Sequence, residues 1–360
     1  MSGALVNLVA KGAQDAFLSG KPEVSFFQSM YKRHTNFAQF PVELFPIGSA
    51  GANNTISLPI TRKGDMLTYI WAESNTDVNT AFGITEPSPS LFRLYVGGQL
   101  IEEHDAFYAL NLYGKFLVNN SAKGYAGRNS VNPEDSTWLP FHFSCCEETG
   151  CALPLVALQY HDVEVRIQFG GGTGGTDTKY YANYIQLDTD ERAAMANAPR
   201  EMLITQVQRI QPETVSDAPK VDLSYFNHPV KALMWGAAGT QNDNGSEYTF
   251  DNAKLTLNGV DTFDPMSNVY FAHVQPYHHS SNSSDLMSYS FSAESDSLYM
   301  YSFALKADKY QPCGTCNFSR LDNAEIKLSG NLSGVLNWFY GVNYNIFRIQ
   351  NGMGGLAFAN

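Results

Sequence analysis

The stretch LPLVALQYHDVEVRIQF at residues 153–169 decides the fold, because its ending has a second copy later in the chain. Residues 163–167, VEVRI, alternate apolar with charged side chains, which is the pattern of a β-strand with one buried and one exposed face. Residues 324–328, AEIKL, repeat this pattern 161 positions further on, with Glu matching Glu and Lys matching Arg. The two segments therefore suggest one strand that occurs in both copies of a repeated unit.

Two further pairs of segments support the repeat. FRLYVGG at 92–98 and AKLTLNG at 253–259 are also 161 positions apart, and each resembles a strand that ends in a glycine turn. MLTYIW at 66–71 resembles KALMW at 231–235, with the tryptophans 164 positions apart, which indicates a small insertion. Because the pairs recur in one order, the sequence predicts two copies of one all-β unit. Chance alternation in a β-rich sequence is the alternative.

Length and composition agree with two folded units. At 360 residues the chain exceeds the size to which a single hydrophobic core usually grows. With 44% hydrophobic and only 16% charged residues, it can form a packed core and is too poor in charge for a disordered segment. Gly, Asn, Ser and Pro separate short apolar runs, as turns between strands require. The predicted class is all-β with long loops.

The charge and the apolar runs exclude some functions. A net charge of −12 disfavours broad contact with phosphates, so we expect no direct nucleic-acid binding. No run approaches the roughly 18–20 apolar residues that span a bilayer, and the first residues lack the apolar core of a signal peptide. We therefore expect a soluble protein that is made in the cytosol.

The sequence predicts no catalytic, cofactor-binding or metal-binding residues. The histidines include no HxH pair of the kind that a metal-binding cupin uses, and the adjacent His278 and His279 are expected on a loop surface. The acidic clusters lie beside glycine turns or at a helix start, which disfavours the paired carboxylates of a glycosidase. Phosphate-binding loops and the GxSxG elbow are missing.

The cysteines are expected to be reduced thiols. The chain has five of them, an odd number, and no export signal. Cys313 and Cys316 have CxxC spacing, but a zinc site needs two further ligands and a redox site needs a βαβ context, and neither is visible nearby.

The first part of the chain is predicted to be an amphipathic arm. Residues 5–18 have apolar side chains near helical spacing, and a second possible helix over residues 22–37 places aromatic side chains on one face ahead of a basic tip. The arm either packs on its own domain or docks onto a neighbouring subunit or another layer of an assembly. The candidate assembly residues are Phe26, Phe27, Tyr31, Lys32 and Arg33.

Eight short strands are expected in the first unit. They are residues 42–47, 55–60, 66–73, 91–96, 138–143, 155–160, 163–169 and 184–187. The loop at 98–136 is too long for a hairpin and holds a predicted helix near 105–117. Eight strands with long crossing loops favour a jelly roll over an up-and-down arrangement.

A short helix marks the predicted boundary between the units. Asp188 is a good N-cap for residues 189–197, and Pro199 follows, so we place the boundary at 197. This gives an arm at 1–24, a first jelly roll at 25–197 and a second at 198–360. Strands of the second unit are expected at 202–210, 231–234, 254–257, 298–305, 324–328 and 343–349. Residues 278–296 are expected to form a loop, and GMGG at 352–355 is predicted to be too flexible for a strand interior.

Several stretches together resemble a known family. They are DAFLSGKP (15–22), YKRHTNF (31–37), VGGQ (96–99), ALPLVALQYH (152–161), LDTDER (187–192), YSFAL (301–305) and GTCNFSR (314–320). The combination, which extends over nearly the whole chain, resembles the major capsid proteins of nucleocytoplasmic large DNA viruses, such as the phycodnaviruses and iridoviruses. The resemblance implies a non-enzymatic structural protein with a double jelly roll, in which each of two tandem antiparallel β-sandwiches has eight strands and short helices lie in the loops.

The resemblance also implies partners and a location. Three chains would form a homotrimer of pseudo-hexagonal outline, the capsomer, and neighbouring capsomers would tile the icosahedral shell of a large double-stranded DNA virus. The arm would face minor capsid proteins and the inner membrane, and the protein would be synthesised and assembled in the host cytoplasm. The chain is short for the family, which suggests trimmed outer loops. A minor or penton-type capsid component of the same fold, or more distantly a carbohydrate-active β-sandwich, is the alternative.

Overall fold

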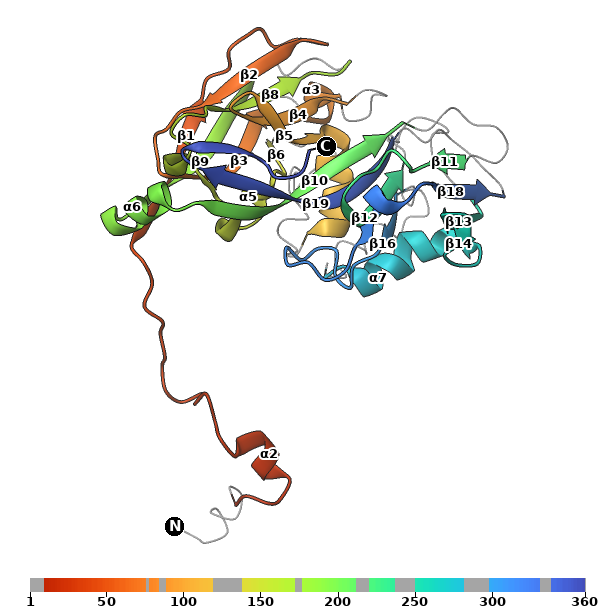
Figure 1. Ribbon diagram of the computed structural model, residues 1–360, viewed down its shortest axis with the longest axis horizontal. Helices are drawn as coiled ribbons and strands as arrows, with labels where there is room; N and C mark the ends of the chain where they lie inside the picture. The colour runs from red at the N-terminus through yellow and green to blue at the C-terminus, as the bar shows by residue number, and fades with distance from the viewer. Residues whose placement is uncertain are drawn as a thin grey trace. The chain divides into compact units, whose positions relative to one another are not determined.

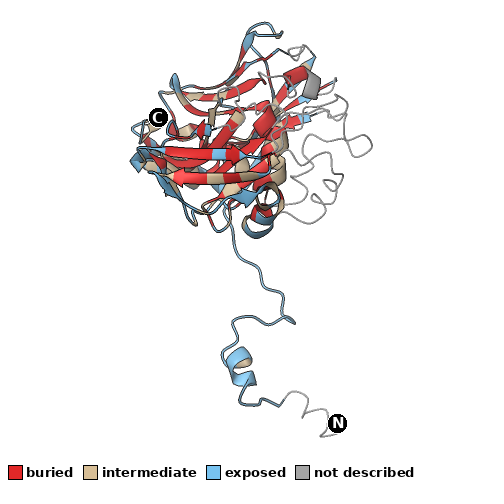
Figure 2. Ribbon diagram, turned by 90° about the vertical axis from the view of Figure 1, so that its right-hand side faces the viewer, coloured by how far each residue is buried: buried red, intermediate tan, exposed pale blue. Residues whose placement is uncertain are grey.

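The computed structural model describes residues 10–75, 78–83, 89–118, 138–171, 177–211, 220–236, 250–281, 298–330 and 338–359. The chain divides into two units, Met1–Asn36 and Phe37–Asn360. In the first, helix α2 (Asp15–Ser19) has five residues, and residues 20–36 form bends, a turn and extended chain. The expected helix over 22–37 is therefore wrong, and the expected helix over 5–18 is found only from Asp15 within the described residues. The ribbon of this unit is coloured as exposed along most of its described length (Figure 2), and its aromatic residues are exposed, so no packing among the described residues stabilises a longer helix.

The first half of the second unit is a sandwich of two antiparallel sheets (Figure 1). One sheet has the order β1 (Phe37–Leu44), β9 (Thr178–Leu187), β3 (Met66–Ser74) and β6 (Trp138–Pro140), and the short β7 (Leu153–Pro154) also pairs with β3. The facing sheet has the order β2 (Thr55–Ile60), β8 (Val163–Gln168), β4 (Leu91–Val96) and β5 (Gln99–Asp105). With β7 left out, the eight strands follow the orders 1-8-3-6 and 2-7-4-5, which is a jelly roll.

The second half repeats this topology. One sheet has the order β10 (Arg200–Ile210), β19 (Trp338–Gln350), β12 (Pro229–Gly236) and β16 (Leu298–Ser302), with β17 (Cys316–Asn317) on β12 and β20 (Met353–Leu356) on β19. The facing sheet has the order β11 (Lys220–Asp222), β18 (Ala324–Ser329), β13 (Asn252–Leu257) and β14 (Val260–Asp261), with β15 (Met266–Ser267) on β13. The orders are again 1-8-3-6 and 2-7-4-5, so the predicted double jelly roll is confirmed.

The strand registers confirm the repeat residue by residue. Phe92 lies opposite Ile167 in the first jelly roll, and Ala253 lies opposite Leu328 in the second, at the predicted offset of 161 for both strands. Arg166 forms an ion pair with Glu164, and Lys327 forms one with Glu325, which is itself buried. The repeated charges in VEVRI and AEIKL therefore occupy the face of equivalent strands that alternates with the apolar core positions.

The two tryptophans, by contrast, are not equivalent, although β3 and β12 are. Met66 in β3 lies opposite Pro154 in β7, and Pro229 in β12 lies opposite Asn317 in β17. Equivalent residues of β3 and β12 are therefore 163 positions apart, which aligns Trp71 with Met234. Trp235 accordingly points into the core of its own jelly roll and is fully buried. Trp71 is half-buried on the other face of its sheet.

Several strand predictions need correction. The first strand begins at Phe37, not 42, and β5 occupies part of the predicted loop 98–136. The expected strand at 155–160 is wrong. Its first residues form a short 3-10 helix, η3 (Leu155–Ala157), which buries Leu155 and Ala157. The GMGG segment is also misjudged: β20 is a strand, and a side chain at Gly354 would come within 2.6 Å of Leu158 and Phe347. Its glycines permit close packing.

Helices connect the strands as follows. Helix η1 (Tyr108–Leu117), a π-helix, confirms the predicted helix, and α6 (Thr189–Asn197) is capped by Asp188, whose Oδ1 accepts the Thr189 N–H at 2.8 Å. The second jelly roll has η4 (Tyr270–Val274) and α7 (Gln275–His279), so His278 and His279 are helical. Residues 282–296 of the predicted loop lie outside the described residues. The remaining short helices are α3 (Val78–Phe82), α5 (Ser144–Glu147), η2 (Thr149–Cys151) and η5 (Phe318–Arg320). No helix in the described ranges is long and apolar enough to cross a membrane.

The hydrophobic core continues from one jelly roll into the other. Leu233, Trp235 and Phe339 pack within the second jelly roll. Met234 and Tyr340, on the opposite face of the same sheet, pack with the core of the first. The sheet formed by β10, β19, β12 and β16 is therefore buried on both faces, and it joins the two jelly rolls.

Candidate functional site

A buried polar group joins the two jelly rolls where β5 ends. The carboxylate of Asp105 accepts hydrogen bonds from the Tyr108 N–H at 2.7 Å, from Arg209 Nη1 at 3.2 Å and from the Tyr340 hydroxyl at 2.8 Å. Burial raises the pKa of the Asp105 carboxyl, and the Arg209 guanidinium opposes that shift. Arg209 and Tyr340 belong to the second jelly roll, so these bonds fix its position against the first.

A second cluster of buried polar residues lies along α5 and β10, at the same contact between the two jelly rolls, which we call the seam. The Ser144 N–H donates to Glu102 Oε2 at 2.7 Å, and the Thr205 N–H donates to Ser144 Oγ at 2.8 Å. Gln206 Nε2 donates to the Ile101 carbonyl oxygen at 2.6 Å. Burial raises the pKa of Glu102 to about 8, so this carboxyl is mostly protonated at neutral pH.

Aromatic rings complete the seam. The Tyr340 ring lies 6.1 Å from the Phe107 ring and 5.9 Å from the Tyr108 ring, measured between centroids. Met234 and Met300 share the Tyr340 face and are fully buried. The first jelly roll thus covers the outer face of the joining sheet of the second.

The corresponding face of the first jelly roll is open. Tyr69 is 47% exposed and Trp138 is 38% exposed, and Trp71 and Tyr181 are half-buried beside them. Ring centroids are 5.6 Å apart for Tyr69 and Trp71 and 5.3 Å apart for Trp71 and Tyr181. We call these four residues the aromatic face. Sequence reasoning missed it, although the apolar run MLTYIW, with no polar alternation beyond Thr68, is typical of a strand covered on both sides.

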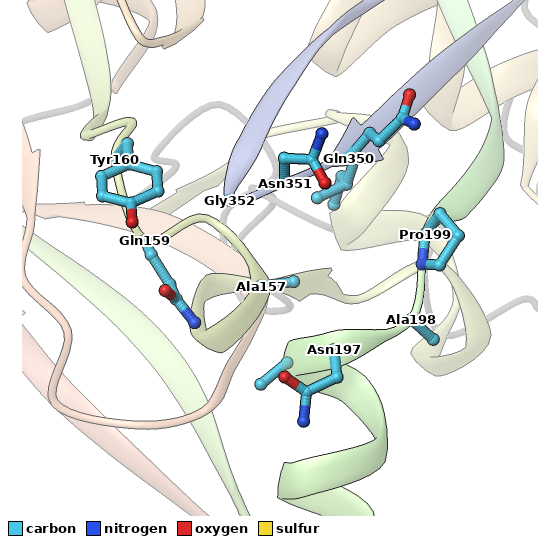
Figure 3. A pocket seen from close by; sticks show the side chains of 11 residues that line it. Ala157, Gln159, Tyr160, Asn197, Ala198, Pro199, Gln350, Asn351 and Gly352 are labelled. Atoms are coloured by element: carbon cyan, nitrogen blue, oxygen red, sulfur yellow. The ribbon is translucent and has the colours of Figure 1, made fainter.

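A shallow pocket of about 390 Å³ lies where the two jelly rolls meet at the end of α6 (Figure 3). Gln159 and Tyr160 come from the first jelly roll, Asn197 from α6, Gln350 from the end of β19, and Asn351 from the turn between β19 and β20. The other lining residues are Ala157, Ala196, Ala198, Pro199, Ile349 and Gly352. Apart from the Tyr160 phenol, the lining offers no titratable side chain, so this pocket has no general acid–base pair or nucleophile–base pair.

The histidines and cysteines do not form a reactive site in the described part of the chain. No three His, Cys, Asp or Glu residues there could jointly hold a metal ion. His278 is exposed, and burial lowers the pKa of His104 to about 3. All five cysteines, which fall within the described ranges, are free thiols.

The predicted assembly residues lie in the first unit, between α2 and β1. The side chains of Phe26, Phe27 and Tyr31 are 91%, 102% and 88% exposed. Lys32 and Arg33, which follow Tyr31, are exposed as well. Their segment is not helical, so the predicted single helical face does not exist, but aromatic and basic side chains remain available to a partner.

Two jelly rolls in tandem, joined through one doubly buried sheet, place the chain in the double jelly-roll class of proteins.

Comparisons with known proteins specify the family. The model of the major capsid protein N-terminus matches residues 25–198, and the model of the large eukaryotic DNA virus major capsid protein matches residues 191–355. The major capsid protein of Pyramimonas orientalis virus is 36% identical, and that of Paramecium bursaria Chlorella virus 1 is 32% identical, with both chains fully covered in each comparison. A chain in the quasi-atomic model of the PBCV-1 capsid superposes with a TM-score of 0.75 at 30% identity, covering 93% of this chain and 100% of that one.

The chain therefore belongs to the major capsid protein family of large eukaryotic DNA viruses. It is a structural protein of the virion capsid and not an enzyme. The Faustovirus major capsid protein, at 11% identity and a TM-score of 0.65 over 92% of this chain and 94% of that one, shares the fold.

Proposed function

We propose that three copies of this chain form a homotrimeric capsomer of pseudo-hexagonal outline, and that neighbouring capsomers tile an icosahedral shell. The aromatic face carries this proposal. Trp71 and Tyr181 occupy the positions of Met234 and Tyr340, which are buried against the other jelly roll within the chain. The equivalent face of the second jelly roll is buried, so the exposed aromatic face of the first is best explained by contact with another copy of the chain.

The repeat supports a trimer for a geometric reason. Two similar jelly rolls per chain give six similar walls from three chains, so a threefold particle can fill a near-sixfold lattice position. Obligate interfaces of this kind commonly bury roughly 2,000 Å² or more. Contacts between capsomers can be weaker, because many of them act together in a shell.

The arm is proposed to connect the shell to what lies beneath it. The exposed aromatic and basic residues that follow residues 1–24 in the same unit suit minor capsid proteins and the inner membrane as partners; they are Phe26, Phe27, Tyr31, Lys32 and Arg33. We assign residues 1–24 to the arm, 25–197 to the first jelly roll and 198–360 to the second. We further propose synthesis and assembly in the host cytoplasm without direct contact with nucleic acid, in keeping with the net charge of −12.

Sedimentation of the purified protein tests the trimer. We expect a stable species near three times 39.8 kDa. Tyr69→Glu should give monomers, because it places a charge in the aromatic face, whereas Tyr225→Glu, which alters a 72% exposed tyrosine elsewhere, should leave trimers. A wild-type protein that stays monomeric at millimolar concentration would refute the proposal. A minor or penton-type role is distinguished by abundance, since the principal shell protein dominates a stained gel of virions.

A further inference from the structure

The seam inside the chain joins two different surfaces. One is the start of η1 in the first jelly roll, where Phe107 projects, and the other is the outer face of the joining sheet, where Tyr340 receives it. Because the two jelly rolls are copies, each contains a counterpart of both surfaces. One surface of each kind is therefore unused: the aromatic face of the first jelly roll and the start of η4 in the second.

Hydrogen bonds fix the counterpart of Phe107. The Ala106 N–H donates to the Ser90 carbonyl oxygen at 2.9 Å, and the Asn268 N–H donates to the Asp251 carbonyl oxygen at 3.2 Å. Ser90 directly precedes β4, and Asp251 directly precedes β13, which is the equivalent strand. The two residues are 161 positions apart, the offset of the repeat. The next residue along is Phe107 in one jelly roll and Val269 in the other.

These counterparts differ in exposure. Phe107 is 3% exposed, whereas Val269 is 54% exposed. Along the helical segment that follows Val269, Val274 is 40% exposed and Tyr277 is 74% exposed. We call Val269, Val274 and Tyr277 the η4 surface. The chain therefore exposes two surfaces whose counterparts pack against each other within the chain: the η4 surface and the aromatic face.

We propose that the η4 surface of one copy packs onto the aromatic face of the next, with Val269 against Tyr181 as Phe107 lies against Tyr340 within the chain. This rests on the proposed trimer and specifies its contact. The contact is heterologous, because the two surfaces differ, and such contacts close into a ring when the rotation between neighbours permits. Three copies then place six jelly rolls in a ring, with seams inside and between chains in alternation.

Charge distinguishes the two kinds of seam. The counterpart of Asp105 is Ser267, and the counterpart of Arg209, which lies opposite Tyr340, is Glu43, which lies opposite Tyr181. Within the chain, Asp105 and Arg209 form an ion pair. Between chains the Ser267 hydroxyl and the Glu43 carboxylate take their places, and these two groups can form a hydrogen bond. An Asp105 surface placed on the aromatic face would instead meet Glu43, and the like charges would disfavour that wrong pairing.

Two blocked variants test the pairing. Val269→Glu blocks the η4 surface, Tyr69→Glu blocks the aromatic face, and each variant alone should sediment as a monomer. Each keeps the surface that the other has lost, so an equimolar mixture should form one-to-one dimers near twice 39.8 kDa. Circular dichroism checks that both variants fold, and if either does not, Val269→Ser or Tyr69→Ser replaces it in the same mixture.

The outcomes separate this inference from the proposed function. If the wild type is trimeric but the mixture of folded variants stays monomeric, or if either folded variant still forms trimers, the pairing is wrong and the trimer stands. If the wild type itself is monomeric, the proposed function fails first. Tyr225→Glu by itself is the control: it keeps both surfaces and should remain trimeric.

Discussion

The hydroxyl of Tyr340 in β19 donates a 2.8 Å hydrogen bond to the buried carboxylate of Asp105 at the end of β5, across 235 residues of sequence. The same carboxylate accepts from Arg209 in β10. The proposed capsomer needs a fixed angle between the two jelly rolls of each chain, because any error in that angle would be repeated around the ring. Hydrogen bonds are directional, so this buried group holds the angle more closely than apolar packing alone.

Tyr340→Phe should weaken the seam without opening a cavity. The variant keeps the ring stacked near Phe107 but leaves the buried Asp105 carboxylate with one partner fewer, which should cost about 1–3 kcal/mol of unfolding free energy. Chemical denaturation of the variant and the wild type measures the difference. Tyr225→Phe, at a 72% exposed position, is the matched control and should change stability by less than about 0.5 kcal/mol. Equal effects would show that the bond does not stabilise the seam.

Glu102→Gln should remove part of the pH dependence of stability. Burial raises the pKa of Glu102 from 4.5 to about 8, so its contribution is fully present below about pH 4.5 and is lost as the pH rises to about 8. The nearby Glu147 carboxylate disfavours ionisation further. Melting temperatures at pH 5 and pH 9 should differ less for Glu102→Gln than for the wild type. The exposed Glu73→Gln is the control, and a variant that loses as much stability as the wild type would contradict the assignment.

Substitution of Trp235 should mainly affect folding, and substitution of Trp71 should mainly affect assembly. Trp235→Ala empties a core position that is fully buried beside Phe339, and it should cost about 3–5 kcal/mol of unfolding free energy. Trp71→Ala removes a half-buried ring from the aromatic face, and it should cost less stability in the monomer while weakening the trimer. Denaturation and sedimentation of both variants provide the test. Comparable loss of folding stability in both would mean that Trp71 belongs to the core.

Deleting residues 1–24 should leave trimers intact but impair shell assembly. Residues 1–24 lie in a unit, Met1–Asn36, that is separate from residues 37–360, so trimer contacts between jelly rolls do not require them. Replacing both Phe26 and Phe27, which follow the deleted residues in the same unit, with serine should also impair shell assembly, because both residues are exposed and available to a partner. Sedimentation reports trimers, and electron microscopy of assembly reactions reports shells. Loss of trimers on deletion would contradict this division of roles.

The repeat was readable from the sequence because period-two alternation is a local property of a strand. Glu164 with Arg166, and Glu325 with Lys327, mark the same non-core face of equivalent strands in both copies, and the structure pairs them as ions. The N-cap Asp188 was readable for a similar reason, since its carboxylate bonds the backbone of the next residue. Where an apolar run lacked alternation, as at Leu155 to Leu158, the sequence could not distinguish a strand from a buried 3-10 turn.

The sequence by itself determined that one all-β unit occurs twice, because the alternation of apolar and polar residues along a strand shows which of its faces is buried. Only the tertiary structure decided that Trp235 is core while Trp71 is surface, and that Phe107 is covered while Val269 is open. These differences arise because one jelly roll covers a face of the other, and that contact joins residues hundreds of positions apart. An apolar side chain has the same sequence signal whether its cover comes from its own chain or from another copy.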